Sequence, residues 1–238
     1  MVDTYLFVIE KKGNMQDRQI KPCWETAIQK LKSGSMVVLY DGDEREGEAD
    51  LVFHAKFAKP ETIRTLRKDA GGLICLSLDS EFAKRLELPF YADILANSDY
   101  SIKEMECKKA AYGDRPAFAI PVNHKGVYTG ITDNDRSLTI RKMAELADEK
   151  ADAKRLHDKF VHDFYSPGHV FLLIGRGIEN RHGHTELTLE LARLAGMSGA
   201  MVLCEMLGEG RALSKEDARQ YAKKNGFAFL EGKDIWQR

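Results

Sequence analysis

The chain has 238 residues, and its 37 acidic and 36 basic residues leave a formal net charge of −1. This balance argues against a protein that is held to nucleic acid by a broad basic field. The four cysteines, Cys23, Cys75, Cys107 and Cys204, form no CxxC pair. We therefore expect neither a disulfide framework nor a structural zinc site.

The N-terminal stretch "MVDTYLFVIEKK" has no basic segment before its short apolar patch and no small-residue cleavage site. No apolar run approaches the roughly 20 residues that cross a bilayer. We expect a cytoplasmic protein with no membrane partner. The periodic pattern begins near Trp24, so residues 1–16 are expected to be an N-terminal extension and residues 17–238 one domain.

Apolar runs typical of strands recur along the chain at 36–40, 73–78, 117–122, 169–174, 200–204 and 227–230. Several are apolar at successive positions, which favours strands that are covered on both faces. Helical patterns lie between them. Such alternation predicts a layered α/β domain.

The helix boundaries are predicted from capping residues. Pro60 can begin a helix that the glycine pair 71–72 ends. Three more helices are expected to begin after a hydroxyl side chain: Ser137, Thr185 and Ser214. The charged segment "DEKADAKRLHDKF" is expected to form a solvated helix.

The stretch "DGDEREGEAD", residues 41–50, follows the apolar run at 36–40 and contains six acidic residues. It can be a solvated loop. However, Glu46, Glu48 and Asp50 alternate, so an extended backbone would point all three to one side. The chain then turns apolar again, and three carboxylates on one face between buried stretches suit Mg²⁺. The residues alone favour neither interpretation.

The stretch "RHGHTE", residues 181–186, begins a predicted helix. The free N–H groups and the positive dipole end of a helix N-terminus suit phosphate. Arg181 can add a bidentate contact, and Gly183 permits close approach of the backbone. The alternative is an ordinary capped helix with two surface histidines.

Three further candidates lie in or beside strands. His169 follows a Pro-Gly turn and can be a general acid or base, although a histidine satisfied at the edge of the core is the simpler interpretation. Glu205 ends an apolar strand and is either a base or a solvated carboxylate. Cys75 lies inside an apolar run, where a buried thiol usually only packs.

Four segments, "DEREGEADLVF", "SPGHVFLL", "RHGHTELTLELARLAG" and "VLCEML", resemble the signature segments of the 3,4-dihydroxy-2-butanone 4-phosphate synthase family of riboflavin biosynthesis. The similarity runs from about Trp24 to about Trp236. It implies a single-domain, three-layer α/β/α fold around a mixed β-sheet. It also implies a homodimer whose active sites are shared between the subunits.

The resemblance implies a lyase that converts ribulose 5-phosphate to 3,4-dihydroxy-2-butanone 4-phosphate and formate. Enediol formation, dehydration, a skeletal rearrangement and loss of C4 are the implied steps. Mg²⁺, with Mn²⁺ as an alternative, is the implied cofactor, and no organic cofactor is expected. Some family members have "RENEGD" where this chain has "REGEAD", and His182 takes the place of a frequent glycine.

The resemblance also implies roles for individual residues. The implied metal ligands are Glu46 and His184. The implied substrate-binding residues are Asp41, Arg45, Glu46, Asp50, Thr129, Arg181, His182, Gly183, His184, Thr185 and Glu205. The implied catalytic residues are Glu48, Asp50, Cys75, His169 and Glu205.

Three other functions compete with this one. A metal-assisted pentose-phosphate isomerase or aldolase would use the same enediolate chemistry, and release of formate separates it from the lyase. A nucleotide- or RNA-binding module would need basic clusters near the pocket. A relative that has lost catalysis would act only as a binding partner, although Glu46, His169, His184 and Glu205 are all present.

Overall fold

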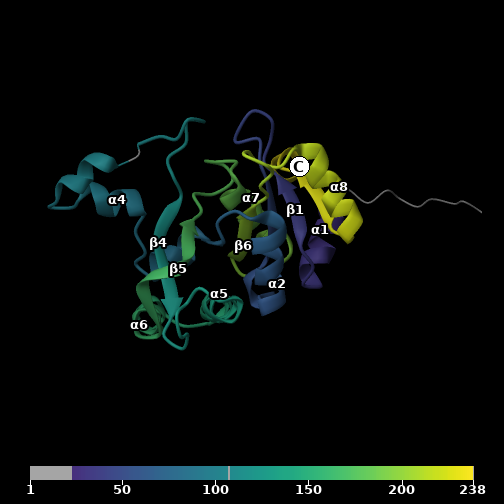
Figure 1. The fold of residues 1–238 in the computed structure, drawn as a ribbon. Coiled ribbons are helices and arrows are strands. Elements are labelled where there is room, and N and C mark those ends of the chain that lie inside the picture. The colour runs from purple at the N-terminus through teal and green to yellow at the C-terminus, as the bar shows by residue number, and fades with distance from the viewer. Residues whose placement is uncertain (1–22, 107, 238) are drawn as a thin grey trace, which may run out of the picture.

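The computed structural model describes residues 23–106 and 108–237, which form one mixed β-sheet with helices on both faces (Figure 1). The seven strands are β1 (Val37–Tyr40), β2 (Ala49–His54), β3 (Cys75–Leu78), β4 (Phe118–His124), β5 (Phe164–Ile174), β6 (Ala200–Glu205) and β7 (Ala228–Glu231). Their spatial order is β4-β5-β3-β6-β2-β1-β7. The predicted extension at residues 1–16 and the domain boundary at residue 17 lie outside the described residues.

The sheet is mixed because β1 pairs in parallel with β7 and β3 with β5, whereas the other neighbouring strands are antiparallel. Successive strand residues point to opposite faces, and both faces are buried along β1, β2 and β3. This confirms the prediction drawn from apolar residues at successive positions.

Two hydrophobic cores lie on the two faces of the sheet. The larger core contains side chains of α2 (Pro60–Thr65), α3 (Ser80–Arg85), α5 (Asp133–Asp148), α6 (Ala153–Asp163), α8 (Lys215–Asn225) and η2 (Leu66–Ala70). The smaller core contains side chains of α1 (Cys23–Lys32), α7 (His184–Leu194) and α9 (Lys233–Trp236). The three-layer α/β/α prediction is therefore confirmed.

The remaining helical elements are α4 (Tyr91–Ala96), η1 (Ala55–Phe57) and η3 (Ser101–Met105). In Figure 1, α4 stands to the side of the layered body, on the side where β4 lies. The segment from α4 to η3 exposes several large apolar side chains: Tyr91, Ile94, Tyr100, Ile102 and Met105.

The predicted strands agree with the structure to within a few residues, except that β2 was missed. Its first two residues, Ala49 and Asp50, are the end of the acidic stretch, and the three apolar residues 51–53 are too few to stand out as a run. All six of its residues are buried, because β2 lies between β1 and β6 in the middle of the sheet.

Two predicted helix starts are wrong. Helix α5 begins at Asp133, because the Thr132 hydroxyl accepts the N–H of Asp135 and caps the helix five residues before Ser137. Helix α7 begins at His184 with Gly183 as its N-cap, so Thr185 lies inside the first turn. The start of α8 is confirmed, because the Ser214 hydroxyl accepts the N–H of Asp217.

The predicted charged helix differs from the structure in its extent and its environment. Helix α5 ends at Asp148, and α6 begins only at Ala153 after the Asp152 cap. Leu156 and Phe160 are buried in the larger core, so α6 is amphipathic rather than solvated on all sides.

Within the described residues, no helix has both the length and the apolar composition to cross a bilayer. The cytoplasmic location stays a prediction.

Candidate functional site

The register of three neighbouring strands brings predicted site residues to one place. Asp50 of β2 lies opposite Glu205 of β6, and Cys75 of β3 lies opposite Leu203 of β6. Residues 203 and 205 are two apart and share a face of the sheet. Cys75 and Leu203 belong to the core beneath α7, so this group lies next to the N-terminus of that helix.

The acidic loop before β2 is folded around Asp41. The buried Asp41 carboxylate accepts the backbone N–H groups of Gly42, Glu46 and Glu48. The loop is a turn at residues 43–46 followed by Gly47 with a φ of +67°. The expected extended backbone is therefore wrong for Glu46, which the turn brings to the same cluster as Asp50.

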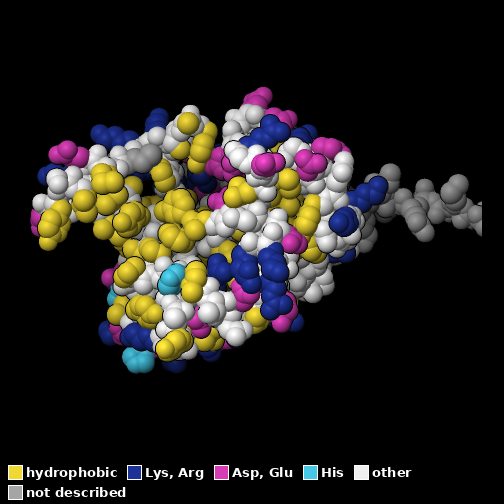
Figure 2. Space-filling view, in the orientation of Figure 1, with side chains coloured by type: hydrophobic (Ala, Val, Ile, Leu, Met, Phe, Trp, Pro, Cys, Tyr) yellow, Lys and Arg dark blue, Asp and Glu magenta, His cyan; other side chains and the backbone are white. Residues whose placement is uncertain are grey.

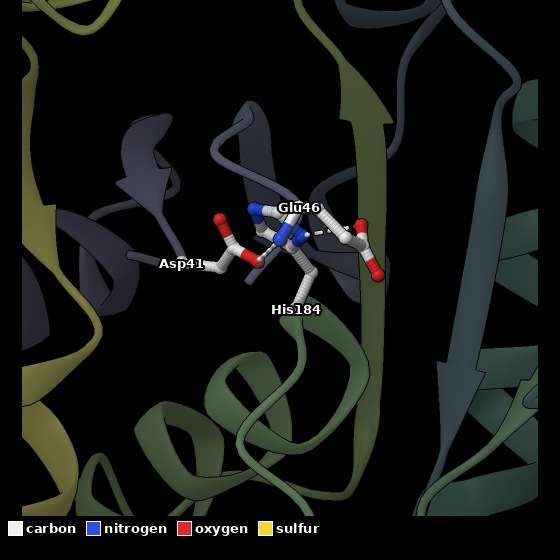
Figure 3. Close-up of side chains that lie close together, drawn as sticks. All are labelled: Asp41, Glu46 and His184. Carbon is white, nitrogen blue, oxygen red and sulfur yellow. Dashed lines mark hydrogen bonds and ion pairs between the residues drawn. The ribbon is translucent and has the colours of Figure 1, made fainter. Parts of the chain in front are cut away.

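His184, the first residue of α7, lies at the centre of the acids. Figure 3 shows its imidazole ring between the carboxylates of Asp41 and Glu46. Nδ1 is 3.6 Å from Glu46 Oε2, and Nε2 is 3.6 Å from Asp50 Oδ1. Nε2 also donates a hydrogen bond to the Glu48 carbonyl at 3.2 Å. Glu48 thus contacts His184 through its backbone.

The charges of this cluster depend on one another. Burial opposes ionisation of Glu46, but the hydrogen bond and the charge of His184 prevail and lower its pKa to about 2. Burial raises the pKa of Asp50. Burial would lower the pKa of His184, but Asp50 and Glu46 raise it instead. His184 and Asp50 together therefore retain a proton at neutral pH.

The donor set suits a hard divalent cation. Asp41, Glu46 and His184 each offer one ligand atom, and the three atoms lie within 4.8 Å of one another. In addition, Asp50 Oδ1 is buried without a hydrogen-bond partner. Carboxylate oxygens are the ligands that Mg²⁺ prefers, and a metal would take over the charge that the retained proton supplies. The residues present therefore fit a magnesium ion.

Arg181 is held rigidly beside this cluster. Its Nη1 donates to Oε2 of the buried Glu186 at 2.5 Å, and the second oxygen of Glu186 accepts the Arg176 N–H. The guanidinium group lies over Gly183, where a Cβ atom would be 2.2 Å from Arg181 Nη1. Only glycine leaves room for the side chain of Arg181 in this position.

Arg45 approaches from the acidic loop. Its Nη1 donates to Asp114 Oδ2 at 2.9 Å, and the same oxygen lies 3.2 Å from Arg181 Nε. The Tyr112 ring lies 5.4 Å from the guanidinium carbon of Arg45. The two arginines therefore meet at one carboxylate at the edge of the acidic cluster.

These groups surround a cavity of about 200 Å³. Its lining residues are Glu46, Asp50, Cys75, Tyr112, Pro116, Ala117, Phe118, Leu173, Arg181, His184, Thr185, Leu203 and Glu205. Seven predicted site residues are thus brought together, and Asp41, Arg45, Glu48 and Gly183 contact the cluster without lining the cavity. A larger cavity of about 620 Å³ is lined in part by Glu186 and contains none of the predicted residues.

Glu205 and Cys75 form part of the cavity wall. Glu205 Oε2 accepts the Leu73 N–H at 2.8 Å, and a Cβ at Gly72 would lie 2.4 Å from the same oxygen. The Cys75 side chain is buried, and burial followed by the charges of Glu205 and Asp50 raises its pKa well above the usual range. Cys75 is therefore a neutral thiol.

Three predicted residues lie outside the cavity wall. His169 is exposed at the beginning of the buried part of β5, and its backbone N–H donates to Asn123 Oδ1. Thr129 is exposed and donates to Asp135. His182 stacks on Trp236 of α9, with ring centroids 4.5 Å apart and planes 6° apart.

The sequence reasoning missed Tyr112, Asp114 and Glu186. Tyr112 and Asp114 lie in "AAYGDRP", a polar turn before β4, and their only signal was that turn at the beginning of a buried strand. Glu186 was inside the "RHGHTE" stretch, but a carboxylate in a first helical turn is common and carries no distinctive signal.

The chain is similar to known proteins of one family. The family model for 3,4-dihydroxy-2-butanone 4-phosphate synthase matches residues 25–238. A relative of that name from Methanosarcina acetivorans is 43% identical over 218 residues, which are 88% of this chain and 87% of the relative. A Bacillus subtilis relative named riboflavin biosynthesis protein RibBA is 31% identical, over 90% of this chain and 48% of its own length.

Solved structures of the same family have a similar fold. The Candida albicans 3,4-dihydroxy-2-butanone 4-phosphate synthase superposes with a TM-score of 0.69 at 28% identity, covering 90% of this chain and 95% of that one. A structure described as this enzyme in complex with two magnesium ions gives the same TM-score and identity over 89% and 93% of the two chains. The chain therefore belongs to the 3,4-dihydroxy-2-butanone 4-phosphate synthase family, whose members include proteins of riboflavin biosynthesis.

Proposed function

We propose that the protein is a Mg²⁺-dependent lyase that converts ribulose 5-phosphate to 3,4-dihydroxy-2-butanone 4-phosphate and formate. The observation that carries this proposal is that a cation-compatible cluster, two carboxylates on paired strands and an arginine pair lie in or beside the wall of one cavity. A phosphorylated sugar that is to be enolised needs these three groups.

Glu46 and His184 would hold the metal, and Asp41 and Asp50 lie close enough to support it. When bound, Mg²⁺ supplies a Lewis acid that stabilises negative charge on the oxygens of an enediolate. Mn²⁺ has a similar preference for oxygen ligands and is the alternative. No organic cofactor is required for these steps.

The phosphate end of the substrate belongs at the arginines. Arg45 and Arg181 converge from the acidic loop and from the turn before α7, and guanidinium groups bind phosphate through paired hydrogen bonds. Thr185 lines the same wall in the first turn of α7, where free backbone N–H groups favour an anion.

The two facing carboxylates suit opposite proton transfers. Burial raises the pKa of Asp50, which favours its action as a proton donor to a leaving hydroxyl. Glu205 is anchored by the Leu73 N–H and can accept the proton from the substrate carbon that is enolised. Glu48 contributes its carbonyl to the orientation of His184, and the neutral Cys75 thiol closes the wall.

The overall reaction balances without added water. The atoms of ribulose 5-phosphate equal those of the four-carbon product plus formic acid. The water lost in the dehydration is therefore taken up again before C4 leaves as formate. The site must therefore hold or admit water between these two steps, and Tyr112, which lines this cavity, is 40% exposed.

The chain is proposed to act as a homodimer with shared sites. His169 and Thr129, which the resemblance assigns to the site, are exposed and are not among the residues that line the cavity of their own chain. Figure 2 shows apolar side chains gathered over the half of the molecule that carries α4, β4 and β5. A second copy that covers this face would bring its own His169 and Thr129 to the cavity.

The test is formate release from ribulose 5-phosphate by the purified protein, with Mg²⁺ and with excess EDTA. We expect formate only when metal is present, and its loss in a Glu205→Gln variant. Substrate consumption without formate would instead establish the isomerase or aldolase. A folded dimer that consumes no substrate with either Mg²⁺ or Mn²⁺ would contradict the proposal.

A further inference from the structure

The turn Ala110–Asp114 places a carboxylate where the two arginines meet. Asp114 Oδ2 accepts a hydrogen bond from Arg45 Nη1 at 2.9 Å and lies 3.2 Å from Arg181 Nε. A single oxygen thus contacts both guanidinium groups. It is the position in which an oxygen of a bound phosphate would satisfy both.

The arginines are left with donors that this carboxylate does not satisfy. Nε and Nη2 of Arg45 and Nε of Arg181 are buried without a hydrogen-bond partner. Buried donors without partners are costly, so the pair favours an acceptor with more oxygens. A phosphate monoester offers three terminal oxygens and two charges, against two oxygens and one charge for Asp114.

The other acids around the arginines cannot leave in the same way. Glu186 is buried and also holds the Arg176 N–H, and Asp41 is buried and holds the acidic loop together. Asp114 differs, because its side chain is 31% exposed and it lies outside the helices and strands. Glu46 also contacts both arginines, but at 3.8 Å, and its other oxygen pairs with His184, so Asp114 is the closer and more exposed of the two acids.

A pivot for such a movement is present next to Asp114. Arg176 donates to the carbonyl oxygens of Arg115 and Pro116, at 3.1 and 3.0 Å, and fixes the chain just after the turn. The turn itself is closed by the hydrogen bond from the Ala110 N–H to the Asp114 carbonyl. The turn can therefore swing as one unit about residues 115 and 116.

We propose that Asp114 competes within the chain for the anion position between Arg45 and Arg181, and that a phosphate group binds both arginines only after Asp114 has left. This inference rests on the proposed function in so far as it assigns the phosphate of the substrate to these arginines. In the free protein, Asp114 occupies the anion position between the two arginines. It reduces the apparent affinity for the anion by the fraction of molecules in which it is in place.

The experiment is a calorimetric titration of the full chain with inorganic phosphate in EDTA, so that metal does not contribute to binding. We expect Asp114→Asn to bind phosphate roughly threefold to tenfold more tightly than the wild type, because one competing charge is removed. Asp114→Glu keeps the charge and should stay close to the wild type.

Asp43→Asn is the matched control. Asp43 lies in the same loop as Arg45, but its contacts are with Tyr40 and Lys215 rather than with the arginines. It loses the same charge and should leave phosphate affinity unchanged. An equal gain in phosphate affinity in Asp43→Asn would mean that the effect comes from the overall charge of the protein. That result would overturn the proposal that Asp114 competes with phosphate.

Weaker phosphate binding by Asp114→Asn would make Asp114 a brace that positions the arginines and would also overturn the proposal. So would undetectable binding by both the wild type and Asp114→Asn. None of these results depends on turnover. Failure of the lyase function would appear in the formate assay, whereas failure of this inference appears in the phosphate titration.

Discussion

At the scale of single residues, the position of the Arg181 side chain depends on the lack of a side chain at Gly183. The backbone of Gly183 has a φ of −81°, which alanine adopts without strain. Space is the constraint, because a Cβ would overlap the Arg181 guanidinium. Since that group is the end of a long side chain, the guanidinium rather than the backbone is expected to shift.

We therefore predict that Gly183→Ala raises the KM for ribulose 5-phosphate by roughly tenfold, since a displaced binding group weakens its contact with the substrate. Steady-state kinetics and thermal unfolding measured on the same preparation check this. Gly208→Ala is the control, because a Cβ there makes only ordinary contacts at 3.6 Å or more. A large loss of stability with unchanged KM would contradict the prediction.

His54 gives a residue-scale prediction about pH. Its Nε2 donates to the Ser198 carbonyl, and burial lowers its pKa below the usual value of about 6.5. The unfolded chain therefore takes up a proton that the folded chain does not. Stability is complete above pH of about 6.5 and falls as the pH is lowered from there toward the folded-state pKa.

We expect His54→Gln to reduce this loss, so that the free energy of unfolding depends less steeply on pH below about 6.5, by at most about 1.4 kcal/mol per pH unit for one proton. Urea unfolding at several pH values measures the slope. His162→Gln, at a side chain that is 86% exposed, is the control and should leave the slope unchanged. If the free energy of unfolding depended on pH with the same slope in His54→Gln and the wild type, the lowered pKa of His54 would not be the cause of the loss of stability.

At the scale of elements, α9 connects the two loops that form the site. The Gly232 N–H donates to the Tyr40 carbonyl just before the acidic loop, and Trp236 stacks on His182 in the turn before α7. The sequence left the role of His182 open and placed it among the substrate-binding residues. In the structure its ring stacks on the ring of Trp236, and we propose that this stack holds the turn in place.

An aromatic stack of this kind contributes about 1 kcal/mol. We predict that His182→Ala and Trp236→Ala raise the KM by a similar factor of roughly two to five, and that His182→Phe, which keeps the stack, stays near the wild type. The double alanine variant should be no worse than either single variant. A defect in His182→Phe equal to that in His182→Ala would point to direct contact of the imidazole with the substrate.

At the scale of the whole molecule, the proposed shared site can be tested by complementation. Glu46 belongs to the acidic cluster, whereas His169 is exposed on β5 and is proposed to complete the site of a second copy. Glu46→Gln and His169→Ala are each expected to be inactive. When the two are refolded together, the mixed dimers contain one site with neither substitution.

Random pairing makes half of the dimers mixed, and each has one intact site in two, so the mixture should recover about one quarter of the wild-type activity. Formate release by the refolded mixture checks this. Either variant refolded alone is the control and should recover none. A mixture that stays inactive although mixed dimers form would mean that His169 acts in the site of its own chain.

The sequence by itself determined the class of fold and most of the residues that meet at the site. Apolar residues at successive positions predicted strands covered on both faces, and the family motifs pointed to Glu46, His184 and Glu205. These signals are local, because hydrophobic patterns, helix caps and motif spacing depend on residues that are close together in the sequence. These local signals failed where contacts with distant residues determine the structure, as for strand β2 inside the sheet and for the start of α7 at His184.

Only the tertiary structure decided which groups touch. Asp50 faces Glu205 through a register between strands that are about 150 residues apart, and Asp114 reaches Arg45 across 69 residues. The same holds for the stack of His182 on Trp236 and the exposure of His169. Contacts of this kind depend on how the layers pack, and no pattern in the neighbouring residues specifies them.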